Sequence, residues 1–326
     1  MPALATYELT KDYAVGFWRK RPYRALDCLT IDVTQGEVFG FLGPNGAGKT
    51  TTLKLLMQLV FPTSGRAEML GRPVGDHSVK RRIGYLPENP YFYDYLTAEE
   101  LLMYFAGLFG YRGTDARART SRLLDEVGIG AERRLQLRKF SKGMLQRVGI
   151  AQALVNDPEL VIFDEPMSGL DPLGRRDVRA MILRLRDRGC TVFFSSHVLS
   201  DAEALCSRVA ILANGRLVAG GRMTDLAHFH VHGWELVVGD VTDEMLQPLQ
   251  SRARRIVRIA EGRYALDLPL ESQPERLLSE LTAAGATLVS LNPVRDTLED
   301  YFVQQVTAPA AQAPRRQPDD GTGGRA

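Results

Sequence analysis

Residues 43–50 read Gly43-Pro44-Asn45-Gly46-Ala47-Gly48-Lys49-Thr50 and match the phosphate-binding pattern G-x-x-x-x-G-K-[ST] at every fixed position. The apolar run 38–42 before this loop is typical of a buried strand, and residues 51–57 after it carry leucines at helical spacing. The loop therefore falls on a strand-to-helix turn, where backbone N–H groups and the helix N-terminus favour bound phosphate. The pattern predicts a bound nucleoside triphosphate, with Lys49 at its β- and γ-phosphates and Thr50 as a ligand of Mg²⁺.

The composition is that of an ordinary globular protein. The chain has 326 residues, of which 44% are hydrophobic and 25% charged, and its net charge is +2. This length leaves room for two domains, and the near-neutral balance does not call for a nucleic-acid or membrane-surface partner. No apolar run approaches the length of a membrane span, and residues 1–5 lack the features of a signal peptide. We therefore expect a cytoplasmic protein that reaches a membrane only through a partner.

The three cysteines, Cys28, Cys190 and Cys206, show neither paired nor metal-ligand spacing. We expect them to be reduced thiols within the core, without a disulfide or a structural metal.

Residues 1–222 alternate strand-like runs with helical patterns, which predicts an α/β fold with a largely parallel sheet. The predicted strands are Val38–Leu42, Arg82–Leu86, Leu160–Phe163, Thr191–Phe194 and Arg208–Leu212. Between about residues 88 and 156 the pattern becomes helical, and Thr97 is placed to cap a helix through residues 101–105. This stretch is expected to be a helical insertion in the α/β core.

A second module is predicted for residues 223–306. Its pattern is β-α-β-β-α-β, with strands at 234–238, 255–259, 263–268 and 287–291 and helices at 243–250 and 274–284. Pro248 weakens the prediction of the first helix. Residues 307–326 are rich in Ala, Pro, Gly and Arg and are expected to be a disordered tail.

Acidic side chains and a histidine follow two of the predicted strands. The strand at 160–163 ends in Asp164 and Glu165, an arrangement in which the first carboxylate holds Mg²⁺ and the second polarises water. His197 follows the strand at 191–194, at the carboxyl edge where doubly wound sheets bind ligands. The alternative for His197 is a cap on the helix that follows it.

Ser141 and Gly143 precede the helical stretch 148–155. At a helix N-terminus they offer a hydroxyl and free backbone N–H groups to an anion. An ordinary capped helix explains the same residues, and both interpretations stay open.

Together, the order and spacing of these motifs resemble the nucleotide-binding subunit of an ATP-binding cassette (ABC) transporter over residues 1–222. The resemblance implies a RecA-like P-loop core with a helical signature subdomain, followed by a small α+β domain. It places Lys49 and Thr50 in the Walker A loop, Asp164 and Glu165 in Walker B, and His197 as the switch histidine. Residues 168–171 correspond to the D-loop and residues 140–144 to the signature motif.

Two positions depart from the usual family pattern. The signature reads Phe140-Ser141-Lys142-Gly143-Met144 instead of LSGGQ, and Glu88 stands at the Q-loop glutamine. A carboxylate can still ligate Mg²⁺ or orient water. Both variants are similar to those of single-domain ATPases serving type-2 exporters, including drug, polysaccharide and antibiotic-resistance systems. Tyr13 stands where the family stacks an aromatic ring on adenine, although an ordinary half-buried strand tyrosine remains the alternative.

The resemblance implies ATP and Mg²⁺ as cofactors, with ATP held between Walker A of one subunit and the signature of another. It therefore implies a dimer, formed with the same chain or a homologous one, and a membrane permease that docks near residues 90–96. Packing within the helical insertion is the alternative for the aromatic residues of this segment. The expected catalytic residues are Glu165, His197 and Lys49, and the expected metal ligands are Thr50, Glu88 and Asp164. The residues expected to contact ATP are Tyr13, Gly43, Pro44, Asn45, Gly46, Ala47, Gly48, Lys49, Thr50, Thr51, Ser141, Gly143 and Asp171.

The function expected from this resemblance is ATP hydrolysis that drives export through a separate permease, at the cytoplasmic face of the membrane. A soluble ABC ATPase acting on ribosomes or DNA is the main alternative. Those that resemble translation factors carry two nucleotide-binding domains in one chain, and those of DNA repair carry long coiled-coil insertions. This sequence has neither feature. A regulator that does not hydrolyse ATP is a third possibility, against which the intact Lys49, Asp164, Glu165 and His197 argue.

Overall fold

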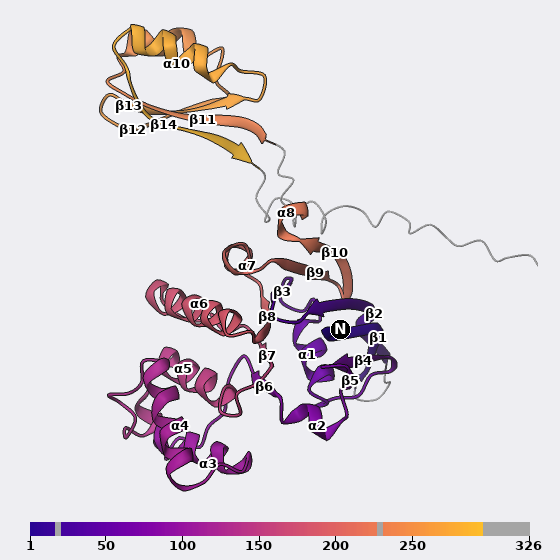
Figure 1. Ribbon diagram of the computed structural model, residues 1–326. Helices are drawn as coiled ribbons and strands as arrows, with labels where there is room; N and C mark the ends of the chain where they lie inside the picture. Colours follow the sequence, from indigo (N-terminus) through magenta and orange to yellow (C-terminus); the bar gives the residue numbers. More distant parts are fainter. Residues whose placement is uncertain (17–20, 227–230, 296–326) are drawn as a thin grey trace, which may run out of the picture.

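The computed structural model describes residues 1–16, 21–226 and 231–295 (Figure 1). Its central element is a six-stranded sheet in the order β10-β9-β3-β8-β7-β6. The neighbouring strands from β9 to β6 pair in parallel, whereas β10 is antiparallel to β9. The strands are β3 (Val38–Leu42), β6 (Ile83–Leu86), β7 (Leu160–Phe163), β8 (Thr191–Ser196), β9 (Arg208–Ala213) and β10 (Arg216–Arg222).

All five predicted strands of the parallel sheet are confirmed, and their ends shift by two residues at most. The predicted strand at 191–194 continues to Ser196, which brings His197 directly to the end of β8. This difference matters for function, because the two added residues carry hydroxyl groups.

The sheet is buried because apolar side chains leave it in both directions. Leu86, Phe163 and Phe194 point into one core cluster, which also holds residues of the helices α3, α5, α6 and α7. Ile162 and Phe193 point into a second cluster, which is completed by α1 and the antiparallel sheet. Continuous apolar runs in the sequence therefore correspond to strands covered on both faces, as parallel sheets require.

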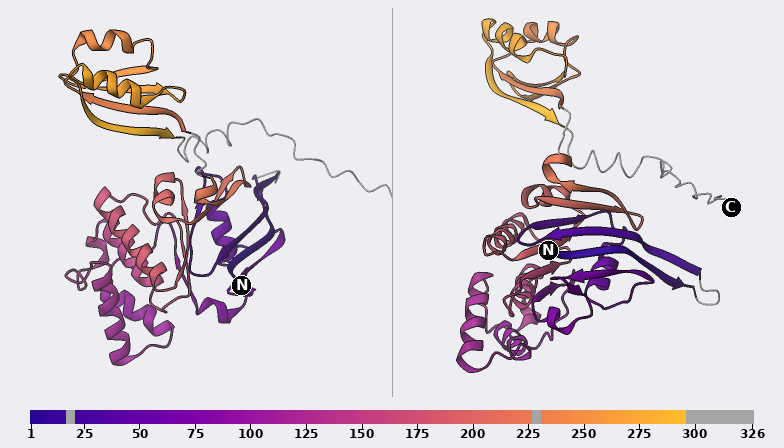
Figure 2. Two further views of the ribbon diagram at one scale, coloured as in Figure 1. Left: turned by 45° about the horizontal axis from the view of Figure 1, so that its top comes forward. Right: turned by 45° about the vertical axis from the view of Figure 1, so that its right-hand side comes forward.

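A second, antiparallel sheet has the order β2-β1-β4-β5 and lies on the side of α1 (Figure 1). Its first two strands form a long hairpin that extends beyond the rest of the domain (Figure 2). The elements are β1 (Pro2–Val15), β2 (Arg21–Thr34), β4 (Ser64–Met69) and β5 (Arg72–Pro73), with α1 (Lys49–Leu56) and α2 (His77–Lys80) between or beside them.

One sequence prediction in this sheet was wrong. Cys28 is exposed, whereas Cys190 and Cys206 are buried free thiols. Cys28 has a φ of 50°, in the left-handed region, within a hairpin whose register shifts repeatedly. The regular alternation of the strand is broken there, so the thiol faces solvent instead of the core.

The helical insertion comprises α3 (Ala98–Leu108), α4 (Gly113–Glu126), a 3₁₀ turn at Leu137–Lys139 (η1) and α5 (Lys142–Ala153). The predicted cap at Thr97 is confirmed, and its side chain forms a capping box with Glu100. The helix predicted at 148–155 begins earlier, at Lys142, because Ser141 is its N-cap and accepts a hydrogen bond from the N–H of Met144. Ser141 therefore lies at a helix N-terminus, as the sequence indicated.

Residues 231–295 contain a separate antiparallel sheet in the order β12-β13-β11-β14. Its strands and helices follow the predicted β-α-β-β-α-β pattern of a ferredoxin-like unit, with both helices on one face (Figure 2). Pro248 limits the first helix to a single turn, followed by a 3₁₀ turn. The elements are β11 (Val231–Gly239), α9 (Asp243–Leu246), η2 (Gln247–Leu249), β12 (Arg255–Ala260), β13 (Arg263–Pro269), α10 (Pro274–Ala283) and β14 (Thr287–Arg295), preceded by α8 (Met223–Leu226). The predicted tail at 307–326 lies outside the described residues.

Two further helices pack beside the parallel sheet, α6 (Pro172–Asp187) and α7 (Leu199–Leu205). They are joined by an ion pair in which Arg179 donates to a carboxylate oxygen of Asp201 through Nε, at 3.1 Å, and through Nη2. Asp201 is only 1% exposed. Removing its partner would leave a buried, unpaired carboxylate, which is strongly destabilising.

We expect Arg179→Ala to lower the free energy of unfolding by about 3–5 kcal/mol, because Asp201 then loses its counter-charge. Arg176→Ala is the matched control on the same helix, since the Arg176 side chain is 75% exposed. The control should change the free energy of unfolding by less than about 0.5 kcal/mol. Urea unfolding followed by circular dichroism measures both, and equal losses in the two variants would contradict this role of the ion pair.

Candidate functional site

The phosphate-binding loop joins β3 to α1, and its glycines are required by close backbone contacts. Gly48 is the N-cap of α1 with a φ of 108°, and a Cβ atom there would lie 2.6 Å from the carbonyl oxygen of Ala25. A Cβ atom on Gly43 would lie 2.3 Å from the carbonyl oxygen of Leu212. The loop therefore wraps tightly against neighbouring backbone at these two glycines.

Lys49, the first residue of α1, has its ammonium group turned back over the loop. It donates to the carbonyl oxygens of Gly43 at 2.6 Å and Pro44 at 3.3 Å. Its Nζ lies 3.2 Å from Oε1 of Glu165, and the lysine is only 6% exposed. The predicted lysine and the predicted general base are thus direct neighbours.

Glu165 also contacts the predicted switch histidine. Nδ1 of His197 lies 2.8 Å from Oε2 of Glu165. The Glu165 carboxylate, which follows β7, therefore contacts both Lys49 of α1 and His197 at the end of β8. His197 does not cap the following helix, because Val198 occupies the N-cap of α7. Of the two interpretations of His197, the structure supports the one at the sheet edge.

Asp164 is almost fully buried beside this group, with 1% exposure. Burial raises the pKa of its carboxyl group above the usual value, while hydrogen bonds from Ser195 and Thr50 act in the opposite direction. The nearby charges of Glu88 and Glu165 raise the pKa further. A nearby cation would favour the ionised form of this carboxyl group.

The oxygen atoms of Thr50, Asp164 and Glu88 are the type of ligand that Mg²⁺ prefers. Thr50 and Glu88 both lie near enough to Asp164 to act on the pKa of its carboxyl group. The chemistry of this donor set fits a bound Mg²⁺ ion.

A cavity of about 460 Å³ opens beside these residues. Tyr13 lies in its wall and is a half-buried residue of β1, so both interpretations of this tyrosine stay open. Sequence reasoning missed two wall residues, Tyr23 and Ala25, whereas Ser168 in the wall belongs to the expected D-loop. Tyr23 pairs with Tyr13 across the β1–β2 hairpin, so the hairpin pattern was the signal that could have revealed it. The other lining residues are Pro44, Asn45, Gly46, Gly48, Lys49, Thr50, Thr51, Glu88, Glu165 and His197.

Two residues of the predicted loop do not line this cavity. Ala47 is buried, and Gly43 contributes its carbonyl group to Lys49. These two residues lie behind the cavity wall, which is formed by the other residues of the loop.

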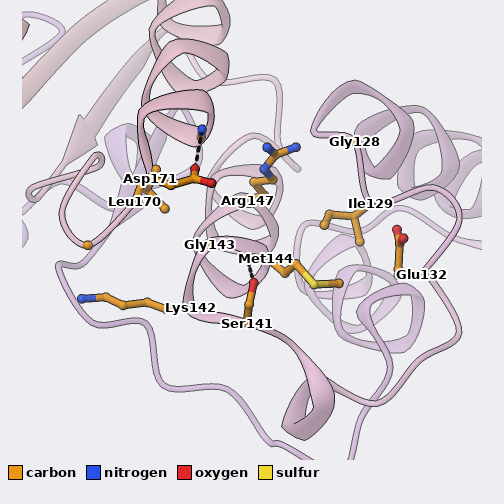
Figure 3. A pocket seen from close by; sticks show the side chains of 12 residues that line it. Gly128, Ile129, Glu132, Ser141, Lys142, Gly143, Met144, Arg147, Leu170 and Asp171 are labelled. Atoms are coloured by element: carbon orange, nitrogen blue, oxygen red, sulfur yellow. Dashed lines mark hydrogen bonds between the residues drawn. The ribbon is translucent and has the colours of Figure 1, made fainter.

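Ser141, Gly143 and Asp171 lie in a different cavity, of about 420 Å³ (Figure 3). Ser141 caps α5, and Asp171 caps α6 by accepting a hydrogen bond from the N–H of Gly174 at 2.7 Å. The N-termini of two helices thus border one hollow, which also contains Lys142 and Arg147. The residues expected to contact ATP are divided between two cavities with different walls.

Comparison with known proteins identifies the family. Residues 26–168 match the family described as ABC transporter. An uncharacterized ABC transporter ATP-binding protein of Synechocystis is 45% identical over 303 residues, which cover 92% of this chain and 84% of that protein. The chain belongs to the ABC transporter ATP-binding proteins.

Two relatives of this ABC protein carry more specific names. A bacitracin transport ATP-binding protein of Bacillus licheniformis is 35% identical, over 93% of this chain and 97% of that protein. A linearmycin resistance ATP-binding protein of Bacillus subtilis is 33% identical, over 84% of this chain and 91% of that protein.

Solved structures of the family confirm the predicted fold class, a RecA-like P-loop core with a helical subdomain. An ATP-binding subunit of an ABC transporter has a TM-score of 0.61 and 33% identity, covering 69% of this chain and 91% of that one. A dimeric cassette in a post-hydrolysis state, bound to ADP and phosphate, has a TM-score of 0.62 and 25% identity. The match covers 68% of this chain and 98% of that one. ATP hydrolysis is the general activity of this family.

In the described part of this ABC protein, no helix is long and apolar enough to cross a membrane.

Proposed function

We propose that the chain is the ATP-hydrolysing subunit of an exporter, working in pairs at the cytoplasmic face of a membrane beneath a separate permease. The main support for this proposal is that the residues expected to contact ATP are divided between two cavities. Lys49, Glu165 and His197 form one half of a site, while Ser141 and Gly143 form the other half elsewhere on the chain. A second subunit, of the same or a homologous chain, would bring the missing half to each nucleotide.

In the proposed reaction, the loop of residues 43–50 binds the triphosphate through its N–H groups and the ammonium group of Lys49. Thr50, Asp164 and Glu88 would hold Mg²⁺, which when bound neutralises charge on the phosphate oxygens. Glu165 takes a proton from water as the water oxygen bonds to the γ-phosphorus and the bond to the leaving ADP breaks. His197 is close enough to Glu165 to orient this carboxylate and the phosphate.

Replacing Glu165 by Gln should lower the rate of ATP hydrolysis by about 10²–10⁴-fold, because the amide cannot accept the proton. Equilibrium binding of ATP should stay near the wild-type value, since the side chain keeps its size and its neighbours. Phosphate release and ATP binding, measured on the same preparation, check the two parts. A wild-type rate of hydrolysis in this variant would remove Glu165 from the proposed mechanism.

The permease is proposed to dock in a groove of about 340 Å³ beside the end of β6. The groove is lined by aromatic side chains of the segment after Glu88 and of α3, among them Phe92, Phe105 and Phe109. Tyr91 stands at its edge and is 98% exposed, and Tyr93 is also exposed. Because Glu88 lines the ATP cavity and Tyr91 the groove, a few residues separate the nucleotide from the proposed partner. The names of the bacitracin and linearmycin relatives support export as the direction of transport.

Replacing Tyr91 and Tyr93 together by Ala should weaken co-purification with the permease, because exposed aromatic side chains are favoured anchors of interfaces. Basal ATP hydrolysis should be unchanged, since neither tyrosine lines the ATP cavity. Tyr104→Ala is the matched control, an exposed tyrosine of α3 outside the groove. Equal recovery of the permease with the double variant and the control would contradict docking at this groove.

A further inference from the structure

Ser195 contacts the carboxylate of Asp164 and the backbone of Glu165, and it has no role in the mechanism described so far. It is the fifth residue of β8 and is fully buried, with 0% exposure. Its Oγ donates a hydrogen bond to Oδ1 of Asp164 at 2.7 Å. The same Oγ accepts a hydrogen bond from the backbone N–H of Glu165 at 2.9 Å.

The position of Ser195 follows from the register of the parallel sheet. Phe163, the last residue of β7, pairs with Phe194 of β8. The next residues along the two strands are Asp164 and Ser195, so the hydroxyl is placed level with the acidic pair. A strand residue facing a catalytic carboxylate could have been apolar, as its neighbours Phe193 and Phe194 are, but here it is a hydroxyl.

The hydroxyl of Ser195 restricts Asp164 in a way that a carbon side chain cannot. A serine hydroxyl has one proton to donate, and this proton is committed to Oδ1 of Asp164. The hydroxyl of Ser195 therefore restricts the rotation of a buried carboxylate that would ligate Mg²⁺.

Ser195 also supports the backbone of Glu165, which is strained. Glu165 has a φ of 50°, in the left-handed region that non-glycine residues seldom adopt. Such a conformation is strained and persists only where surrounding contacts impose it. The hydrogen bond from the Glu165 N–H to Ser195 is one such contact, and the resulting turn directs the Glu165 side chain to Lys49 and His197.

The neighbouring Ser196 has a different task. Its Oγ accepts a hydrogen bond from the N–H of Val198 at 2.9 Å and donates to the carbonyl oxygen of the same residue at 3.2 Å. It therefore stabilises the turn around His197 and contacts neither carboxylate through a hydrogen bond. Two adjacent serines thus hold two different parts of the site.

We propose that Ser195 is the positioning residue of the Walker B pair, whose one hydroxyl orients Asp164 toward Mg²⁺ and holds Glu165 in its strained conformation. This inference rests on the proposed function, because the metal and the hydrolysis belong to it. Ser195 does not line the ATP cavity, and it acts through the carboxylate of Asp164 and the backbone N–H of Glu165.

Ser195→Val and Ser195→Thr form a matched pair, because both add the same volume in the core and only threonine keeps the hydroxyl. The full chain is loaded with a non-hydrolysable ATP analogue, and Mn²⁺ is added in place of Mg²⁺. Electron paramagnetic resonance then measures Mn²⁺ binding and the symmetry of its ligands. Binding of the analogue without metal and the rate of ATP hydrolysis with Mg²⁺ complete the comparison. Ser195→Ala repeats the measurement without added volume, and Ser196→Ala is the neighbouring control.

Relative to Ser195→Thr, the valine variant should bind Mn²⁺ about ten- to a hundredfold more weakly and hydrolyse ATP more slowly by a similar factor. The Mn²⁺ spectrum should change, while binding of the analogue without metal should stay within about twofold, because the phosphate loop is intact. Ser195→Ala should follow valine, and Ser196→Ala should keep the wild-type Mn²⁺ affinity.

Equal Mn²⁺ affinities, spectra and rates in the valine and threonine variants, in a wild-type chain that hydrolyses ATP, would overturn the role of Ser195 alone. A wild-type chain that neither binds Mn²⁺ with nucleotide nor hydrolyses ATP would overturn the proposed function, and the role of Ser195 with it.

Discussion

The contact between Lys49 and Glu165 is the interaction on which the rest of the site depends. The lysine is almost fully buried, and a buried ammonium group is costly unless it is paired and hydrogen-bonded. Both conditions are met, because the carbonyl groups of the loop and the Glu165 carboxylate surround Nζ. Burial and the nearby charges of Glu88 and Glu165 raise the pKa of Asp164. The Mg²⁺ ion proposed for this site would offset that concentration of negative charge.

The two proposed half-sites of the chain are connected through two polar contacts, the first of them buried. Gln146 of α5 donates from its side chain to the carbonyl oxygen of Pro166 at 3.0 Å, directly after the Walker B pair. Arg147 of the same helix pairs with Asp177 of α6 at 2.9 Å. The helix capped by Ser141 is therefore tied to the segment that carries Glu165 and to the helix that begins at Asp171. A partner nucleotide at Ser141 would be expected to bias both elements.

Much of this architecture could be predicted from the sequence because the motifs are short and lie next to regular elements. The loop at 43–50, the pair Asp164 and Glu165, and the helix cap at Ser141 were recognisable from a few adjacent residues. Features that depend on contacts between residues far apart in the chain could not be predicted in this way. Ser195 meets Asp164 only through the register of β7 with β8, and Tyr23 enters the cavity wall only through pairing with Tyr13. Cys28 was misassigned to the core because an irregular left-handed residue breaks the alternation of its strand.

The most direct test of the central role of Lys49 is the equilibrium affinity for ATP of the Lys49→Ala variant, with Lys54→Ala as an exposed control on the same helix. Loss of a charge-assisted hydrogen bond to phosphate should weaken binding by at least about tenfold, whereas the Lys54 control should bind like wild type. Wild-type affinity in the Lys49→Ala variant would contradict a triphosphate site built around this lysine.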